Sequence, residues 1–462
     1  MTKPLFKEFD PVSSKAWKQK IQVDLKGADY NDTLIWKTNE GIDVKPFYHA
    51  DEFKVLPEIS SSKSTEWKIC QSILVNDAKE ANLKAIEAIE SGAESIMFQI
   101  LSDDISTEQL FQNIDLKSIQ IDLKCHFLST DFLKKIQDII SNKSEKWHHS
   151  VTLHTDIIAK LAKTGNWYVN LKDDHSKFEA IVKSINQFSV DLGLYQNAGA
   201  NIVQQLAYSL AHANEYLNHL CNSITSEAKQ SLQVTFNVSV GSNYFFEIAK
   251  LRALRQLWAS LASEYNINTN CKIIATPSKR NKTIYDYNVN MLRTTTECMS
   301  AILGGADTIC NLAYDSLYHK SNEFGDRISR NQLLVLKNES YFNKVNNPTD
   351  GAYYIEKLTE QLAEKALTLF KNIEANGGFL RQLKDSVIQR KIKESATKEQ
   401  TDFDNGKLIL LGTNKHPNPS DAMKTDIEVN PFLNIEKRKT LIAPIIEKRL
   451  AEALEIERLD NE

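Results

Sequence analysis

Apolar residues along this chain fall into two alternating patterns, short continuous runs and longer stripes with helical spacing. The clearest junction between the two lies within Ser189–Leu220, where an apolar run passes through the turn Tyr195–Gly199 into an amphipathic stretch. Apolar residues that recur every three to four positions predict a helix with one buried face. A strand that leads through a turn into a helix is half of a βαβ unit.

Eight apolar runs have the length of buried strands, and helical stretches separate most of them. This alternation is typical of a parallel sheet with helices outside it, and eight strands predict a (β/α)8 TIM barrel. A doubly wound open sheet is the alternative, weakened because no G-x-G-x-x-G motif follows the first strand. The predicted strands are Lys68–Leu74, Ser95–Ile100, Ile119–Cys125, Trp167–Leu171, Ser189–Leu194, Val234–Val240, Lys272–Thr276 and Asp307–Leu312. The predicted helices are Ala78–Glu90, Asp131–Ile140, Ser150–Lys163, Ser176–Gln187, Ala200–Cys221, Tyr244–Tyr265 and Tyr287–Leu303.

The same patterns divide the chain into three parts. We expect an N-terminal arm and interface segment over residues 1–66, the barrel over 67–345, and a C-terminal helical extension over 346–462. The extension contains predicted helices at Tyr353–Asn376, Asp385–Lys398 and Ala443–Leu459. The arm is too short for a core of its own, so its aromatic residues are expected to lie on the barrel or on a partner. The interface candidates among them are Trp17, Trp36, Phe47 and Tyr48.

Composition narrows the class of protein. The formal net charge is −4, which implies no strongly basic face and argues against a nucleic-acid partner. No apolar run is long enough to span a membrane, and the first residues lack the apolar core of a signal peptide. The six cysteines are scattered and form no C-x-x-C pair, which favours reduced thiols over a disulfide framework or a metal site. We therefore expect a cytoplasmic protein without a membrane partner.

Residue types alone indicate no convincing catalytic set. The ten histidines show no metal-binding spacing. Asp191, within a predicted strand, could bind a polar group inside the barrel or pair with a cation on a nearby strand. The basic run Lys279–Lys282 follows the seventh predicted strand, where it could meet a phosphate or could equally form a solvated loop or an interface.

Several long motifs resemble those of adenosylcobalamin-dependent acyl-CoA mutases, in particular the small subunits of heterodimeric methylmalonyl-CoA mutases. The resemblance covers nearly the whole chain. The arm contains WKTNEGIDVKP, similar to the family pattern W-x-T-x-E-G-I-x-V-K-P, and QNAGA resembles Q-E-A-G-A. Further matches are NYFFEIAKLRALRQLW at Asn243–Trp258, Gly304–Gly305 with the strand that follows, Phe324–Arg330, and NPTDGAYYIEKL at Asn347–Leu358.

The departures from the family pattern concern its catalytic residues. Catalytic subunits carry a tyrosine–histidine pair just before Q-E-A-G-A, and this chain has Gly193 and Leu194 there. Leucine donates no hydrogen bond, and losing one such donor typically removes ~2.7–4 kcal/mol of transition-state stabilisation. The Arg-, Pro- and Tyr-rich segment of catalytic subunits is absent between Asp51 and Trp67. The S-Q-T-S-G stretch that binds the CoA ester is replaced by Ala275–Lys279, which includes a proline without a backbone donor.

The resemblance therefore implies the non-catalytic small subunit of an isomerase of propionate metabolism that interconverts (R)-methylmalonyl-CoA and succinyl-CoA. The D-x-H-x-x-G motif of the cobalamin-binding domain is missing. We accordingly expect no such domain, no catalytic residue, no cofactor or metal on this chain, and adenosylcobalamin bound by a large catalytic partner subunit in a heterodimer. The alternatives are a degenerate barrel that acts as a scaffold or homodimer, and a CoA-ester-binding chain completed by a separate cobalamin-binding subunit. We also expect bulky strand residues to fill the barrel interior, with Phe98, Ile121, Phe236 and Ile274 as candidates.

Overall fold

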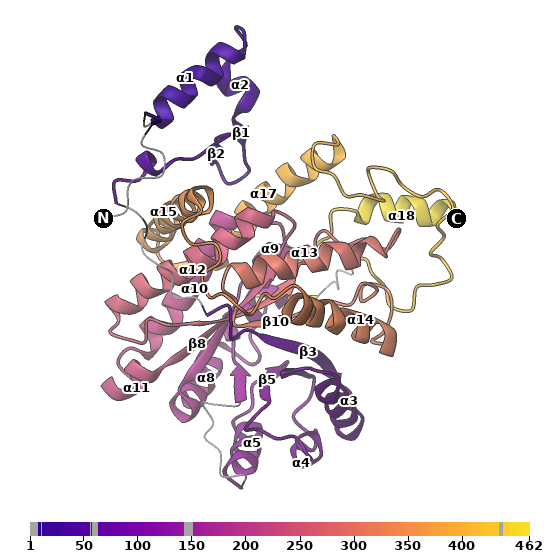
Figure 1. Cartoon of the computed structure of the whole chain (residues 1–462). Coiled ribbons are helices and arrows are strands. Elements are labelled where there is room, and N and C mark those ends of the chain that lie inside the picture. The colour runs from indigo at the N-terminus through magenta and orange to yellow at the C-terminus, as the bar shows by residue number, and fades with distance from the viewer. Residues whose placement is uncertain (1–7, 11, 56, 58–62, 143–150, 434–437) are drawn as a thin grey trace.

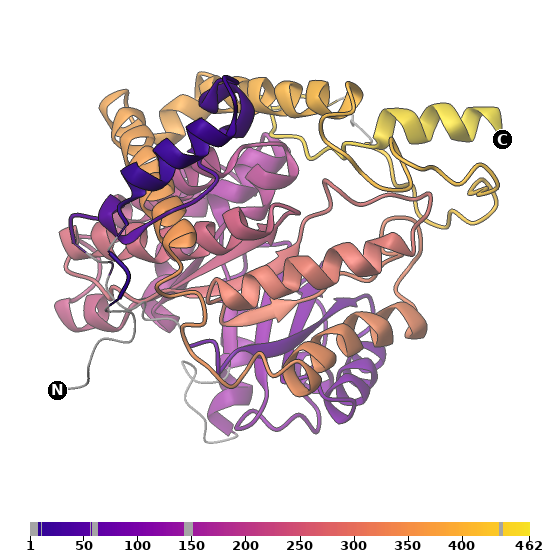
Figure 2. The same ribbon diagram turned by 45° about the horizontal axis from the view of Figure 1, so that its top comes forward.

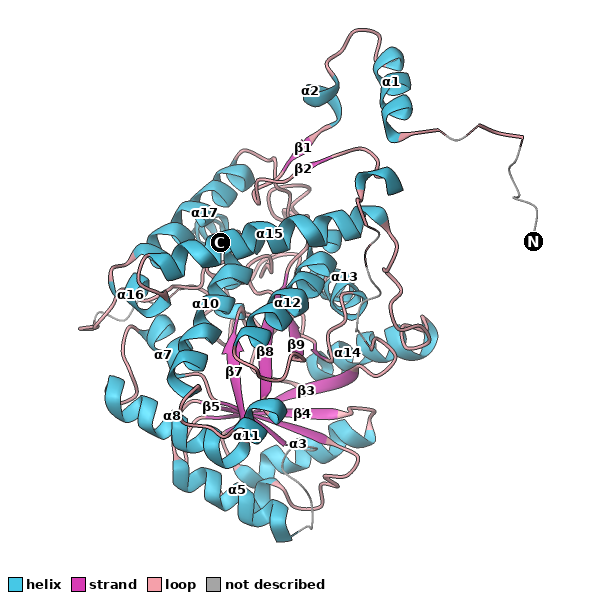
Figure 3. Ribbon diagram, turned by 90° about the vertical axis from the view of Figure 1, so that its left-hand side faces the viewer, coloured by secondary structure: helices cyan, strands magenta, loops and turns pink. Residues whose placement is uncertain are grey.

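The body of the molecule, in the computed structural model, is an eight-stranded parallel sheet that curls almost into a barrel with helices around it (Figures 1 and 3). The structure describes residues 8–10, 12–55, 57, 63–142, 151–433 and 438–462. This architecture confirms the predicted barrel class. The strands are β3 (Lys68–Val75), β4 (Ser95–Ile100), β5 (Gln120–Cys125), β6 (Val151–His154), β7 (Gln187–Asp191), β8 (Gln233–Val240), β9 (Lys272–Pro277) and β10 (Thr308–Cys310).

The strands follow one another around the sheet in the order β6-β5-β4-β3-β10-β9-β8-β7. Strand β10 pairs with β3 in parallel, which brings the first and last barrel strands together. The ladder is interrupted only between β6 and β7, among the described strands. There the Ser189 amide donates to the Thr155 carbonyl at 3.3 Å. The sheet is thus a barrel with one weak seam, and the open-sheet alternative is wrong.

The side chain of Gln187 bridges this seam in place of a strand ladder. Its Oε1 accepts from the Leu153 amide at 3.3 Å, and its Nε2 donates to the Val151 carbonyl at 3.2 Å. Both backbone groups lie in β6, whose remaining ladder is with β5. One buried side chain therefore supplies both polar partners that β6 lacks on this side.

We expect Gln187→Leu to lower the free energy of unfolding by about 1–3 kcal/mol, because it leaves a buried donor and a buried acceptor of β6 without partners. Hydrogen–deuterium exchange should show faster exchange in the peptide that contains Leu153 than in β5 peptides. Gln233→Leu is the matched control, since Gln233 is exposed and faces Gln187 in register on β8. Equal effects of the two substitutions would contradict this role of Gln187.

The interior prediction was wrong for three of its four residues. Phe98 and Ile121 point outward into the apolar layer beneath the surrounding helices, and Phe236 packs on Trp258 with ring centroids 5.5 Å apart. Only Ile274 faces inward, where it joins Cys70, Met97 and Cys310. Strands of parallel sheets are buried on both faces, so their residue pattern carries little alternation that would distinguish the inside from the outside.

A charged network occupies the middle of the barrel instead. Asp122 is fully buried and accepts from Lys272 Nζ at 2.9 Å and from Ser95 Oγ at 3.0 Å. The His154 ring lies between Asp122 and Asn237, with its two nitrogens 3.3 and 3.0 Å from them. Paired polar groups and the small apolar cluster around Ile274 therefore lie in the interior, in place of the bulky residues predicted.

Ten helices of the barrel region surround the strands or cap their ends. They are α3 (Ala78–Glu90), α4 (Thr107–Leu110), α5 (Thr130–Asn142), α7 (Ile157–Thr164), α8 (Leu171–Ile185), α9 (Gly193–Asn197), α10 (Ile202–Leu220), α11 (Ser226–Ser231), α12 (Tyr244–Glu264) and α13 (Val289–Leu303), among the residues that the structure describes. Helix α14 (Glu323–Leu334) and the π-helical turn η2 (Val335–Glu339) follow β10.

The fourth predicted strand, Trp167–Leu171, is wrong. Helix α8 begins at Leu171, and the Asp174 carboxylate accepts from the amides of Tyr168 and Val169 at 2.7 and 3.1 Å. These two hydrogen bonds hold Tyr168 and Val169 in the loop that leads into helix α8. The true strand, β6, lies inside the segment predicted as the helix Ser150–Lys163, because its four residues are too few to show a period of their own.

The first helix of the C-terminal extension packs beside the arm, whereas its last helix lies away from the arm (Figures 1 and 2). Its helices are α15 (Tyr353–Ala375), α16 (Phe379–Lys384), α17 (Val387–Asp404) and α18 (Glu452–Asn461). The predicted helix Ala443–Leu459 is wrong in its first half. Pro444 disfavours helix at the residue before it, and the amides of Ile445, Lys448 and Leu450 donate instead to carbonyls of α7, α9 and the loop after β9.

The first two helices of the N-terminal arm project away from the body of the molecule (Figures 1 and 3). Its elements are α1 (Ser14–Asp24), α2 (Tyr30–Leu34), the antiparallel pair β1 (Trp36–Lys37) and β2 (Asp43–Val44), and the 3₁₀ turn η1 (Ala50–Glu52). Helix α1 has no buried residue. The hairpin is anchored by the buried Ile42 and Val44, so the arm is fixed at its base and exposed at its end.

Candidate functional site

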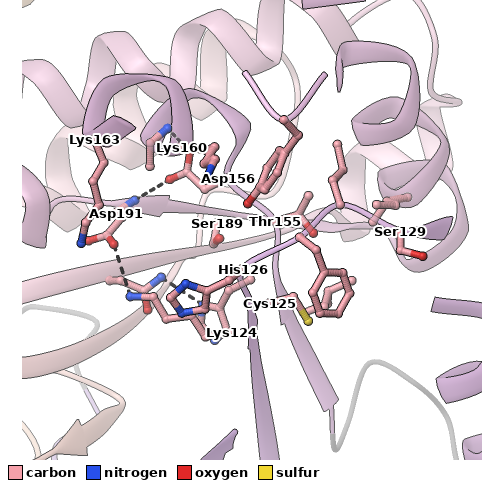
Figure 4. Close-up of a pocket in the computed structure, with 18 of the residues that line it drawn as sticks. Lys124, Cys125, His126, Ser129, Thr155, Asp156, Lys160, Lys163, Ser189 and Asp191 are labelled. Atoms are coloured by element: carbon pink, nitrogen blue, oxygen red, sulfur yellow. Dashed lines mark hydrogen bonds and ion pairs between the residues drawn. The ribbon is translucent and has the colours of Figure 1, made fainter. Parts of the chain in front are cut away.

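A cavity of about 220 Å³ lies at the carboxyl ends of β5, β6 and β7, where catalytic groups gather in TIM barrels. We call it the mouth cavity. Figure 4 shows its polar side chains, which include Lys124, Asp156, Lys160, Lys163 and Asp191. They reach the cavity from the ends of β5 and β7, from the loop after β6 and from α7.

Leu194 lines this cavity, at the position where the family resemblance implies a catalytic histidine. It lies in α9 and is buried. The neighbouring Gly193 leaves no room for the tyrosine of the catalytic pair, because a Cβ there would lie 2.8 Å from Ser239 Oγ and 3.0 Å from Asp191 Oδ1. The structure thus accommodates glycine and leucine at these positions and excludes a tyrosine at the first without rearrangement.

Asp191 pairs with a cation on a nearby strand, which was one of the two roles considered for it. Its Oδ2 lies 3.4 Å from Lys124 Nζ of β5, and its Oδ1 accepts from the Gly193 amide at 2.9 Å. Burial raises the pKa of Asp191, but the charges of Lys124 and Lys163 outweigh burial and lower it overall. The Asp191 charge in turn raises the pKa of Lys124. Both groups stay ionised near neutral pH, so neither serves as a general acid or base there.

A fully buried lysine holds the Q-N-A-G turn to the barrel. Lys250 Nζ donates to Gln196 Oε1, Gln205 Oε1 and the Ser239 carbonyl at 2.9, 3.1 and 2.7 Å. Glu247 Oε2 lies 2.5 Å from the same nitrogen. The turn and the first part of α12, which carry two of the family-like motifs, therefore form one buried polar cluster.

The basic run after β9 is structural for most of its length. Arg280 donates to Glu399 Oε2 at 2.6 Å and to the Lys448 carbonyl at 2.7 Å. Lys282 is buried and pairs with Glu297 at 2.7 Å. The phosphate-binding interpretation of these two residues is therefore wrong, because their charges are already paired.

Residues 441–450, which we call the rim segment, lie against the elements that come directly after the barrel strands β6, β7 and β9. Within it, the Ile445, Lys448 and Leu450 amides donate to the carbonyls of Ala162, Asn197 and Arg280 at 2.7, 3.1 and 2.9 Å. These hydrogen bonds hold the rim segment against α7, α9 and the loop after β9.

Neither a metal centre nor a membrane-spanning element emerges from the described ranges. No three His, Cys, Asp or Glu side chains there converge as metal ligands require. None of the helices described combines the length and the apolar composition needed to cross a bilayer.

The four aromatic interface candidates of the arm differ in exposure. Trp17 and Trp36 are 52% and 51% exposed. Phe47 contacts Trp17 edge-on at 6.2 Å between ring centroids, while Tyr48 packs on Tyr354 of α15 at 5.2 Å. Trp17 and Phe47 therefore contact each other on the arm, whereas Tyr48 and one edge of the half-exposed Trp36, 5.8 Å from Phe246 of α12, pack on the body.

Sequence reasoning missed the lysines of the mouth cavity. Lys160 and Lys163 fall on a segment predicted to be a crossover helix, and Lys124 on a strand without a motif. The signal that could have found Lys124 is a lysine two positions after an aspartate in an otherwise apolar run. Two such charges in one strand point to the same face, here the barrel interior.

Comparisons with known proteins agree with the motifs. The family model described as methylmalonyl-CoA mutase matches residues 97–455. The chain is 36% identical over 445 residues to the "Methylmalonyl-CoA mutase small subunit" of Porphyromonas gingivalis, covering 90% of this chain and 71% of that one. It is 28% identical to the methylmalonyl-CoA mutase of Cereibacter sphaeroides, covering 94% and 68%. The human mitochondrial methylmalonyl-CoA mutase is 26% identical, with 87% and 60% covered.

Proposed function

Because this chain belongs to the methylmalonyl-CoA mutase family, we propose that it is the non-catalytic small subunit of a heterodimeric mutase. The observation that carries the proposal is the pair Gly193–Leu194 in the wall of the mouth cavity. A leucine there offers no hydrogen bond to a thioester carbonyl. The relative named as a small subunit supports the same assignment.

The proposed partner is a large subunit that carries out the reaction. Enzymes of this family generally depend on adenosylcobalamin, which supplies the radical chemistry when bound. The buried Leu194 and the charged network in the barrel interior support binding of the substrate, and with it the cofactor, by the large subunit. In this proposal the holoenzyme interconverts (R)-methylmalonyl-CoA and succinyl-CoA, and this chain stabilises the catalytic subunit.

The exposed end of the arm is the proposed contact surface for that subunit. Trp17 and Trp36 present large apolar area at low conformational cost, as anchors of protein interfaces commonly do. Phe9, Val12 and Val23 are also exposed on the arm, at 69%, 59% and 71%. An arm that is fixed at its base and exposes several large apolar side chains on its free part is suited to reach a second chain.

Co-purification from native lysate, with this chain as bait, tests the proposal. The eluate and the purified chain are each assayed for mutase activity with added adenosylcobalamin. We expect a large mutase subunit in the eluate and activity only in the complex. Turnover by the isolated chain would contradict the non-catalytic assignment. A homodimer without a partner would favour the scaffold alternative, and capture of a small cobalamin-binding chain would favour a CoA-ester-binding chain.

We expect Trp17→Ala and Trp36→Ala each to weaken capture of the large subunit roughly tenfold, since interface tryptophans commonly contribute more than 1 kcal/mol. Titration of the separately purified subunits measures this change. Leu83→Ala is the matched control, because Leu83 is 60% exposed on α3 and lies away from the arm. Capture that is unchanged in both tryptophan variants would remove the arm from the interface.

A further inference from the structure

The mouth cavity has an apolar side that the proposed function does not use. It is formed at the ends of β5 and β7 and by helices α5 and α8, which close it from the outside of the barrel. The apolar residues that line it are Phe127, Leu128, Phe132, Ile181 and Leu194. Such a pocket, apolar with a few convergent polar groups, has the make-up of a small-molecule site.

The opposite side of the cavity is lined by charged side chains, three lysines and two aspartates. The Asp191 carboxylate pairs with Lys124 and accepts from the Gly193 amide. The Asp156 carboxylate accepts from the Ala159 and Asp191 amides and from the Tyr216 hydroxyl at 2.8, 2.8 and 2.7 Å, and its Oδ1 lies 2.9 Å from His212 Nε2. Neither carboxylate pairs with Lys160.

Lys160 is the lysine of the cavity that lacks an ion pair among the described residues. Lys163 pairs with Glu447 at 3.3 Å, whereas Lys160 lies over the Tyr168 ring at 5.1 Å. Burial and the positive charges of Arg438 and Lys163 lower the pKa of Lys160, and the Asp174 charge opposes them. Burial and the charges of Lys124, Lys163 and Lys160 lower the pKa of His126.

We propose that the mouth cavity binds a short-chain monocarboxylate, with the carboxylate at the Lys160 ammonium and the alkyl chain against Leu128 and Phe132. The charge-assisted bond gives Lys160 the ion pair that it lacks among the described residues. An engineered cavity of about 150 Å³ holds benzene, so 220 Å³ suits a ligand of somewhat more than that size. The charged network around Asp122 fills the barrel below, which excludes ligands with a long tail along the axis.

Ligand-observed NMR on the full chain tests this with three probes: butyrate, acetate and n-butanol. Butyrate has both the anion and the apolar tail, whereas each of the other probes has one of them. We expect saturable butyrate binding at one site, at least about tenfold tighter than either acetate or butanol. Butyrate binding no tighter than that of acetate or butanol would overturn the proposal. The test uses the chain alone, so its result does not depend on partner capture.

Variants then locate the site. Lys160→Gln should weaken butyrate binding roughly tenfold, and Lys160→Arg should retain most of it. Leu128→Ala should weaken butyrate binding several-fold and leave acetate binding unchanged, because only the tail contact is lost. Lys172→Gln, at an exposed lysine of α8, is the matched control. Thermal melting establishes that each variant is folded. Equal butyrate affinity in the folded Lys160→Gln and Lys172→Gln variants would overturn the assignment of the anion to Lys160.

Discussion

The Asp122→Ala variant is expected to lose about 3–5 kcal/mol of unfolding free energy, because removing one partner of a buried ion pair leaves an uncompensated charge. Lys272 would lose its carboxylate partner and keep, among the described residues, the hydrogen bond to Thr152 Oγ1 at 3.3 Å. His154 would lose the carboxylate that lies against one of its two ring nitrogens. Urea titration measures the change, through a lower midpoint at an unchanged slope.

Asp131→Ala is the control for that experiment. Asp131 pairs with Lys134 on α5, but its side chain is 83% exposed, so no measurable change in stability is expected. The contrast separates the effect of a buried charge from the effect of removing any carboxylate. Similar midpoints for the two variants would show that the interior network contributes little to folding.

The same carboxylate makes stability depend on pH in a defined direction. Burial raises the pKa of Asp122, but the Lys272 charge and the contacts with His154 outweigh it and hold the pKa well below its ordinary value. The unfolded chain therefore takes up this proton first as the pH falls, near its ordinary value of about 3.9. The stabilisation is present above that pH and is lost below it. The stability difference between wild type and Asp122→Ala should accordingly narrow from about pH 5 to about pH 3.

The Lys250→Met variant is expected to lose about 3–5 kcal/mol of unfolding free energy, since it leaves the buried Glu247 carboxylate without its cation. It also removes the donor that joins Gln196, Gln205 and the Ser239 carbonyl. Burial lowers the pKa of Lys250 while Glu247 opposes that shift, so the pair supports the charged form of the lysine. Urea unfolding measures the loss, and faster hydrogen exchange around α9 should accompany it.

A double-mutant cycle makes this prediction specific. Lys250→Met with Glu247→Gln should cost less than the two single changes together, by about 1–2 kcal/mol, because the second substitution removes the stranded charge. Lys391 and Glu394 on α17 have the same i, i+3 spacing, but their side chains are 52% and 53% exposed. Lys391→Met should therefore leave stability unchanged. Strict additivity in the buried pair would contradict its coupling.

The sequence by itself determined the elements whose pattern is long and local. Helix α3 was predicted with its observed bounds, and α12 and α15 to within one residue at each end, because each repeats a helical period over three or more turns. It also determined the family, through motifs such as QNAGA, and the replacement of the catalytic pair by Gly193 and Leu194. These properties depend on residue identity and on neighbours in the chain.

The tertiary structure alone decided what faces the barrel interior and what lines its mouth. Phe98 and Asp122 lie in runs that are buried on both faces, so only the closed sheet shows that the phenylalanine points outward and the aspartate inward. Strand β6 exists as a strand because β5 pairs with it, and residues 441–450 are not helical because distant carbonyls of α7, α9 and the loop after β9 accept their amides. Lys160 joins Lys124 and Asp191 only after three separate βα units close around one cavity. Contacts between residues that are far apart in the chain leave no local period, and this is the physical reason why the sequence could not reveal them.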